Sequence, residues 1–312
     1  MKTVVIAIGG NSLIQDARHQ SVPDQYAAVV DTVRHITDLL QRRCRVVITH
    51  GNGPQVGFIL LRSEHSRGVL HQVPLDSIVA DTQGALGYQL QQALENEFRR
   101  RGLKKSVATV VTQTLVDESD PAFAKPTKPI GEFYTREQAA ERMRVEQWTM
   151  AEDSGRGWRR VVASPKPVRI IEAQVVRHLV KAGYVVVAAG GGGIPVVADE
   201  RGLLRGVPAV IDKDLASAVL ARQIGADLLM ISTSVEKVCL NFGRPDQQEL
   251  DSMTVAQAKE FAAQGHFPPG SMLPKVEACV HFLQSGGREA VITCPSKLSL
   301  ALDGGGGTRL MP

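Results

Sequence analysis

The feature that most constrains the fold of this chain is a short β-branched segment that ends directly in glycines. Three such segments occur: residues 3–8 before Gly9 and Gly10, residues 45–49 before Gly51 and Gly53, and residues 184–189 before the glycines of 190–193. A short apolar run that stops at glycine is typical of a buried strand that enters a loop. The sequence therefore predicts strands whose carboxyl ends open into glycine-rich loops.

Helical patterns and further strand patterns alternate with these segments. The helical patterns cover residues 25–41, 81–101, 170–181, 214–223, 255–264 and 274–284, and the additional strand candidates cover 107–112, 227–232 and 290–293. This alternation predicts an α/β fold with a mostly parallel sheet that helices cover on both faces. Such sheets bind ligands at the carboxyl ends of their strands, where the glycines fall.

One long segment breaks the alternation. Residues 121–167 contain five prolines and both tryptophans, without a clean strand or helix period. An insertion of this length is typical of a functional lid or a small subdomain. A variable surface excursion fits the pattern equally well.

Composition excludes several classes of protein. Lys and Arg total 36 and Asp and Glu total 32, so the net charge of +4 allows an anionic ligand without indicating a nucleic-acid-binding surface. We expect no membrane span, because the uncharged stretches are too short, and no signal peptide pattern occurs. The four cysteines are scattered without a C-x-x-C pair, which suits a reducing cytosol and argues against a zinc site or a disulfide framework.

The glycine loops indicate phosphate binding, because glycine lets backbone N–H groups approach an anion closely. A single loop of this kind is weak evidence, since tight turns use glycine anyway, but three favour a phosphate site. The usual nucleotide signatures are absent: no G-x-x-x-x-G-K-[ST] occurs, and the glycines at 51, 53 and 57 lack the G-x-G-x-x-G spacing. The sequence therefore predicts phosphate handling without a P-loop.

Phosphoryl transfer needs positive charge around the moving group, and three lysines have suitable positions. They are Lys128 in the proline-rich insert, Lys213 between Asp212 and Asp214, and Lys275 at the start of a helical pattern. A single lysine is most often a solvated surface charge, but two flanking carboxylates are typical of a positioned ammonium. Either aspartate also fits a helix N-cap.

The histidines form no metal-binding pattern, so we expect no metal ligands from the chain. His50 is the one histidine in a candidate site, and a core or turn role is the favoured interpretation for it.

Eight blocks of this sequence closely resemble the carbamate kinases of the amino-acid-kinase superfamily. They are His50-Gly-Asn-Gly-Pro-Gln-Val-Gly57, Pro126-Thr-Lys-Pro-Ile-Gly131, Glu152-Asp-Ser-Gly-Arg-Gly-Trp158, Ala163-Ser-Pro-Lys-Pro167, Gly190-Gly-Gly-Gly-Ile-Pro195, Val210-Ile-Asp-Lys-Asp214, Glu236-Lys-Val-Cys239 and Gly265-His-Phe-Pro-Pro-Gly-Ser-Met-Leu-Pro-Lys275. The blocks run in the family order over essentially the whole chain.

The resemblance implies one three-layer αβα sandwich domain over residues 1–312, with a protruding lid at about 121–167. The N-terminal half would hold carbamoyl phosphate, and residues 184–312 would hold the adenine nucleotide. The implied reaction is ATP + carbamate ⇌ ADP + carbamoyl phosphate, with Mg²⁺. The family is homodimeric and cytoplasmic, and it often runs toward ATP in arginine, agmatine or purine-derived ureido catabolism. Neither nucleic acid nor membrane is an expected partner.

The resemblance also assigns site residues motif by motif. The expected catalytic residues are Lys213, Lys275, Asp214 and Lys128. The expected substrate-binding residues are Gly9, Gly10, Asn11, Gly51, Asn52 and Gly53. The expected nucleotide-binding residues are Gly191, Gly192, Asp212, Ser232, Lys237 and Met272. We expect Asp214 to orient Lys213 and Lys275, and Lys128 to lie away from them when no anion is bound.

Two positions refine the resemblance. Acetylglutamate-kinase-like enzymes place a lysine two residues before the first glycine pair, where this chain has Ala7, and Lys213 would replace that charge. The family often has Leu-Thr-Gly or Leu-Thr-Ala where this chain has Ser232-Thr-Ser234. The tail, Gly307-Thr-Arg-Leu310, also departs from the family pattern. Two alternatives stay open: a superfamily kinase of another small carboxylate or phosphonate, and a catalytically silent sensor with the same fold.

Overall fold

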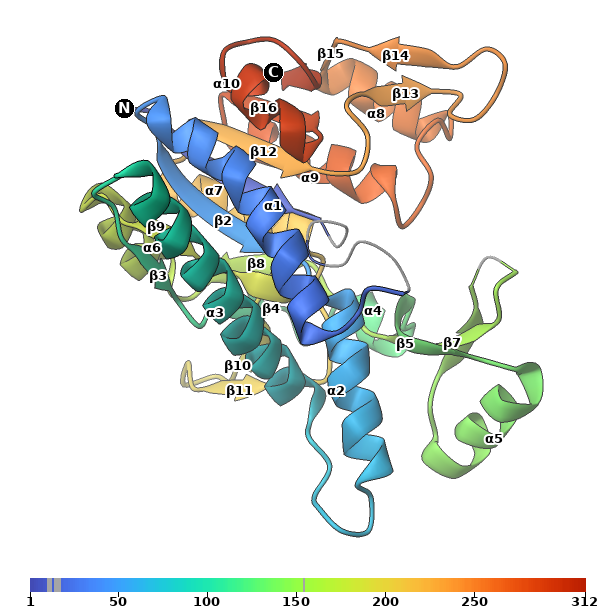
Figure 1. Ribbon diagram of the computed structural model, residues 1–312. Helices are drawn as coiled ribbons and strands as arrows, with labels where there is room; N and C mark the ends of the chain where they lie inside the picture. Colours follow the sequence, from blue (N-terminus) through green and yellow to red (C-terminus); the bar gives the residue numbers. More distant parts are fainter. Residues whose placement is uncertain (10–12, 14–17, 154) are drawn as a thin grey trace.

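The main sheet confirms the predicted mostly parallel arrangement (Figure 1). The computed structural model describes residues 1–9, 13, 18–153 and 155–312, and within them this sheet has eight strands in the order β15-β17-β16-β12-β1-β2-β9-β3. In that order their bounds are Ser252–Thr254, Thr308–Met311, Glu289–Thr293, Leu228–Ser232, Thr3–Ile8, Arg45–His50, Val185–Val187 and Val107–Thr109. Neighbouring strands are parallel except for β16 and β17.

Alternate side chains of β1 show why the sheet is covered on both faces. Val4 and Ile6 belong to one buried apolar cluster, whereas Val5 and Ala7 belong to another. Successive side chains of a strand point to opposite faces, so an uninterrupted apolar strand requires a helical layer on each side.

The helices supply these two layers. One face carries α1 (Val22–Gln41), α3 (Leu75–Arg101) and α10 (Leu298–Leu302), and the other carries α6 (Ala173–Lys181), α7 (Lys213–Ile224), α8 (Val255–Ala263) and α9 (Met272–Gln284). The result is the expected αβα sandwich. α1 begins with a capping box between Ser21 and Asp24, and α3 ends at Gly102, whose φ of 66° only glycine adopts readily.

Smaller elements complete the main body. A second sheet has the order β11-β10-β4-β8, with bounds Leu204–Gly206, Ile194–Ala198, Gln113–Val116 and Pro167–Ile170. The remaining elements of the main body are α2 (Gly53–His65), the hairpin of β13 (Val238–Leu240) and β14 (Gln248–Leu250), and the short helices η2 (Gly190–Gly192) and η3 (Pro295–Lys297).

Some predicted boundaries differ from the observed ones. The helix predicted from residue 170 begins at Ala173, because Ile170 pairs with Thr114 as the last residue of β8. The strand predicted over 107–112 ends at Thr109.

The insert over 121–167, which shows no clean strand or helix period in the sequence, contains regular structure. It consists of α4 (Pro121–Ala124), β5 (Lys128–Tyr134), α5 (Arg136–Glu146), β6 (Met150–Glu152) and β7 (Trp158–Val162). The strands form an antiparallel sheet in the order β5-β7-β6, and the unit projects from the main body (Figure 1). A register shift between Ile130 and Tyr134 breaks the alternation that would reveal β5 in the sequence.

None of the helices in the described residues has the length and apolar character needed to cross a membrane.

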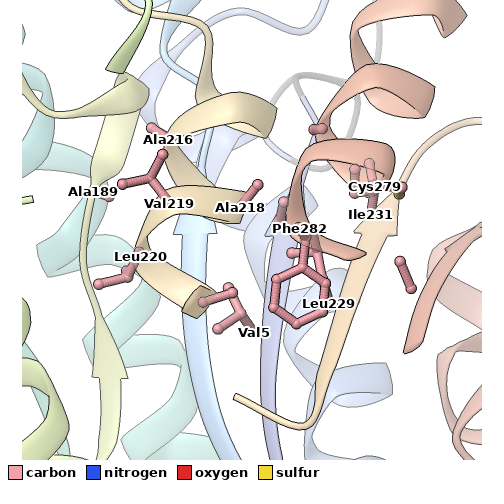
Figure 2. Packing of buried hydrophobic residues seen from close by; sticks show 14 of the residues in the cluster. Val5, Ala189, Ala216, Ala218, Val219, Leu220, Leu229, Ile231, Cys279 and Phe282 are labelled. Atoms are coloured by element: carbon pink, nitrogen blue, oxygen red, sulfur yellow. The ribbon is translucent and has the colours of Figure 1, made fainter. Parts of the chain in front are cut away.

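The core between the sheet, α7 and α9 is tightly filled. Figure 2 shows Phe282 of α9 beside Leu229 of β12, with Val219 and Leu220 of α7 across the same cluster. The Phe282 side chain is fully buried, and Gly287 lies so close that a Cβ there would meet the ring at 2.6 Å. Phe282 therefore fixes α9 against the sheet.

We predict that Phe282→Ala lowers the free energy of unfolding by about 3–5 kcal/mol, because it leaves a cavity in this core. Phe242→Ala is the matched control, since the Phe242 side chain is 59% exposed and its loss should cost less than about 1 kcal/mol. Urea unfolding measures both values. Equal losses in the two variants would contradict the assignment of Phe282 to the core.

Candidate active site

The loops after β1 and β2 lie side by side at the carboxyl edge of the sheet. Ile8 and His50 are register partners at the ends of these parallel strands, and the backbone N–H of Gly51 donates to the Ile8 carbonyl at 3.2 Å. Gly9 therefore lies next to the loop that contains Gly51. Gly10 and Asn11 lie outside the described residues, so their contacts stay a prediction.

Asn52 and Gly53 form the start of α2 at this edge. Asn52 is buried, and its side-chain amide donates to Thr82 Oγ1 at 2.9 Å instead of capping the helix. The first N–H groups of α2 are thus not satisfied by an Asn52 cap. An added Cβ at Gly53 would meet no atom of the described residues within 4 Å, so none of them fills this position.

The glycines of 190–193 pack against the loop that contains Asn52. Gly191 and Gly192 are both buried. A Cβ at Gly191 would collide with the Asn52 amide, and one at Gly192 would lie 2.6 Å from the Ile211 carbonyl oxygen. Close packing against protein atoms therefore requires glycine at both positions, and their contact with the nucleotide stays a prediction.

A buried aspartate joins two of the predicted lysines. Asp214 is 3% exposed; its Oδ1 accepts from Lys213 Nζ, and its Oδ2 accepts from Lys275 Nζ at 3.2 Å. Lys213 begins α7 and Lys275 lies in the first turn of α9. The predicted contact of Asp214 with both lysines is therefore confirmed.

Asp212 has a different role from Asp214. It is the N-cap of α7, where its Oδ1 accepts from the backbone N–H of Asp214 at 2.9 Å and of Leu215 at 3.2 Å. Burial alone would raise the pKa of Asp212, but the charges of Lys128 and Lys213 and these two N–H donors outweigh it and lower the pKa below its usual value. Asp212 therefore stays ionised between two ammonium groups.

Lys128 reaches the same cluster from the insert. Its Nζ donates to the Ile211 carbonyl at 3.1 Å and lies 3.6 Å from Asp212 Oδ2. The expectation that Lys128 stays away from the other lysines without an anion was wrong. Asp212 attracts Lys128 and Lys213 together, and the sequence could not show that β5 crosses so close to α7.

A cavity of about 180 Å³ lies beside the start of α9 and contains two of the predicted nucleotide residues. Its lining comprises Thr233, Ser234, Val235, Lys237, Cys239, Phe242, Pro268, Ser271 and Met272. Lys237 pairs with Asp251 at 2.7 Å, and this hydrogen bond raises the pKa of the lysine. Phe242 was missed, although an apolar residue between Asn241 and Gly243 in a polar turn is a recognisable signal.

Ser232 does not line this cavity. Its side chain is fully buried at the end of β12, next to Thr293 of β16, and among the described residues neither hydroxyl has a hydrogen-bond partner. The predicted contact of Ser232 with the nucleotide stays a prediction.

His50 is a neutral core residue, as the sequence favoured. Its Nδ1 lies 2.9 Å from the Gly51 carbonyl oxygen, and a carbonyl only accepts, so Nδ1 carries the proton. Burial lowers its pKa to about 4; the Gly51 bond opposes this shift and the Lys213 charge adds to it. The site therefore gains no positive charge from His50.

Gln83 of α3 was missed by the sequence analysis. Its amide nitrogen donates to the carbonyls of Thr112 and Gly190, and its oxygen accepts from the Thr112 N–H. A glutamine buried on an amphipathic helix is the signal that could have revealed it. These hydrogen bonds join Gly190, the first of the glycines of 190–193, to Thr112 and to α3.

The chemical capacity of the edge follows from its charges. The ammonium groups of Lys128, Lys213 and Lys275 and the carboxylates of Asp212 and Asp214 lie together in one cluster. Such an arrangement can neutralise a phosphoryl group in transit without a P-loop.

Comparisons with known proteins agree with this geometry. The model of the amino acid kinase family matches residues 2–294. The chain is 52% identical to the carbamate kinase-like protein YahI of Escherichia coli, over 99% of this chain and 98% of that protein. It is 47% identical to the carbamate kinase of Thermococcus kodakarensis, over 100% of this chain and 99% of that protein.

The fold is also similar to that of a solved carbamate kinase structure. The carbamate kinase from Giardia lamblia bound to AMP-PNP matches with a TM-score of 0.93 at 40% identity, covering 99% of this chain and 98% of that one.

We predict that His50 stays neutral in the folded protein until the pH falls to about 4. An unfolded histidine takes up a proton near pH 6.5, so between pH 6.5 and 4 the unfolded chain binds more protons and the free energy of unfolding falls as the pH is lowered. Urea unfolding of the wild type and His50→Gln at pH 7 and pH 5 should show a smaller stability gap at pH 5. A ring that titrates near 6.5 by NMR would contradict the prediction.

Proposed function

The chain belongs to the amino acid kinase family, and we propose that it is a carbamate kinase that catalyses ATP + carbamate ⇌ ADP + carbamoyl phosphate. The observation that carries this proposal is the cluster in which buried Asp214 holds Lys213 and Lys275 at the edge of the sheet. The full-length similarity to carbamate kinases supports the choice of substrate. Residue 7 is a fully buried alanine, so the positive charge at this edge of the sheet comes from the lysines.

In the proposed mechanism, Lys213 and Lys275 neutralise the negative charge that spreads over the equatorial oxygens of the phosphoryl group. Asp214 holds both ammonium groups in place, so they need no reorganisation during transfer. Carbamate presents an anionic oxygen as the nucleophile, so no side chain has to remove a proton from it.

The two substrates occupy opposite sides of this cluster in the proposal. Carbamoyl phosphate binds Lys128 and the backbone N–H groups of the loops at 9–11 and 51–53. The adenine nucleotide binds in the cavity lined by Lys237 and Met272. The insert over 121–167 acts as a lid, and its closure keeps water from carbamate and carbamoyl phosphate, which both react with it.

Mg²⁺ is proposed to arrive with the nucleotide. No group of three or more metal-binding side chains occurs in the described part of the chain. Mg²⁺ commonly keeps several waters and binds through substrate phosphates, so the phosphate oxygens of ATP or ADP are fitting ligands. Bound there, the ion would neutralise phosphate charge.

The cellular setting is also part of the proposal. The family resemblance supports a cytoplasmic homodimer that runs toward ATP in arginine, agmatine or purine-derived ureido catabolism. No nucleic acid or membrane takes part.

A kinase of another small carboxylate or phosphonate is the second candidate. It is favoured by the 52% identity to YahI, which is described as carbamate kinase-like. A catalytically silent sensor would keep the fold without turnover. Formation of ATP from ADP and carbamoyl phosphate separates these functions.

We predict that the wild type forms ATP in this assay, and that Lys213→Ala and Lys275→Ala each lower turnover by about 10²–10³-fold, because each removes a preorganised charge. Lys259→Ala, at an exposed position of α8, is the control and should keep wild-type turnover. Near-normal turnover in both site variants would refute the assignment. Absence of ATP formation by the wild type would refute the proposed reaction.

A further inference from the structure

Two glycines from separate sequence motifs touch where the lid crosses the main body. Gly57 is buried in α2, and Gly131 lies in β5. A Cβ added to Gly57 would lie 2.9 Å from Gly131 Cα and 3.4 Å from its nitrogen. Real Cβ atoms do not approach backbone this closely, so the helix and the strand meet backbone to backbone only because residue 57 is glycine.

The strand bends at this contact. Gly131 has a φ of 71°, which strains other residues, and the pairing of β5 with β7 shifts register between Ile130 and Tyr134. Ile130 is almost fully buried in an apolar cluster that includes Val56 of α2. The bend therefore carries β5 across α2 while the preceding residue anchors it.

This anchor determines the direction of Lys128. Alternate residues of a strand share a face, so Lys128 leaves β5 on the same side as buried Ile130. Lys128 Nζ then reaches the Ile211 carbonyl at 3.1 Å, next to Asp212. At about 3.3 Å per residue, the three residues from Gly131 to Lys128 span roughly 10 Å. A displacement of the strand at Gly131 is thus transmitted to the ammonium group.

The lid has a second attachment to the same helix. Glu64 lies two turns after Gly57, and its carboxylate is 3.9 Å from the Arg142 guanidinium of α5. Arg67 pairs with Glu146 of the same lid helix. Because α2 also begins at the Asn52 loop, one helix holds both the substrate loop and the lid.

From these contacts we infer that Gly57 is a positioning residue: with Gly131 it forms the seat on which the lid strand rests, and the seat sets the reach of Lys128 into the phosphoryl site. The inference rests on the proposed function for the role of Lys128. Gly57 itself touches no substrate.

The test compares Gly57→Ala with Gly84→Ala. Both replace a glycine inside a helix, but a Cβ at Gly84 of α3 meets no atom of the described residues within 4 Å. Gly57→Ala must push β5 away, and a displacement of about 1 Å in an active site typically costs on the order of 10²-fold. We expect KM for carbamoyl phosphate to rise about tenfold or more and KM for ADP to change less than about twofold. Lys128→Ala should show the same split, and Gly84→Ala should match the wild type.

Tryptophan fluorescence provides a readout that does not depend on activity. Trp148 and Trp158, the two tryptophans of the chain, both belong to the lid, and Trp148 lines a cavity shared with Glu64 and Pro208 of the main body. The emission spectrum of Gly57→Ala without ligand should differ from that of the wild type, whereas Gly84→Ala should not differ. If the wild type makes no ATP, the proposed function fails. The emission spectrum then tests by itself whether Gly57 and Gly131 position the lid strand.

Two further results complete the test. A folded Gly57→Ala protein with wild-type emission and an unchanged KM for carbamoyl phosphate would overturn the inference. If Gly57→Ala does not fold, Gly131→Ala replaces it, because its added Cβ has no contact closer than 3.9 Å and only the positive φ is strained. The same shift in KM and emission, at smaller size, would support the seat, and its absence would refute it.

Discussion

The arrangement of this protein depends on one buried carboxylate shared by two ammonium groups. Removing a charged group from water is costly unless it is paired and hydrogen-bonded, and each oxygen of Asp214 accepts from one lysine. Because Lys213 begins α7 and Lys275 lies in the first turn of α9, this interaction also fixes the starts of two helices that pack on the same face of the sheet. The structure thereby places two positive charges where parallel strands end.

Two neighbours of this cluster, His50 and the glycines of 190–193, add no charge to it. His50 is kept neutral by burial, and the glycines of 190–193 are held by the amides of Asn52 and Gln83. Asp212 caps α7 and attracts Lys128 from the lid. The charges of this cluster are therefore those of three lysines and two aspartates, and the lid, which contacts α2 at Gly57, supplies one of the lysines.

Sequence reasoning predicted what depends on local pattern. Apolar strands that end in glycine showed the parallel sheet and its functional edge, and the Asp212-Lys213-Asp214 string indicated a positioned lysine. It could not predict what depends on packing between distant segments. The burial of Gly191 depends on the Asn52 side chain, the burial of Ser232 depends on β16, and the position of Lys128 depends on how β5 crosses α2. The short, bent strands of the lid lack the period that reveals longer elements.

The most direct test of this account is the pH profile of Asp214→Asn. If Asp214 acts by holding the two lysines, the amide keeps its shape but loses the charge that attracts them, so turnover falls while the pH dependence of the remaining activity stays within about one unit of the wild type. A shift of one unit or more would show that this carboxylate takes up and releases a proton during the reaction. That result would contradict the central role assigned to Asp214 here.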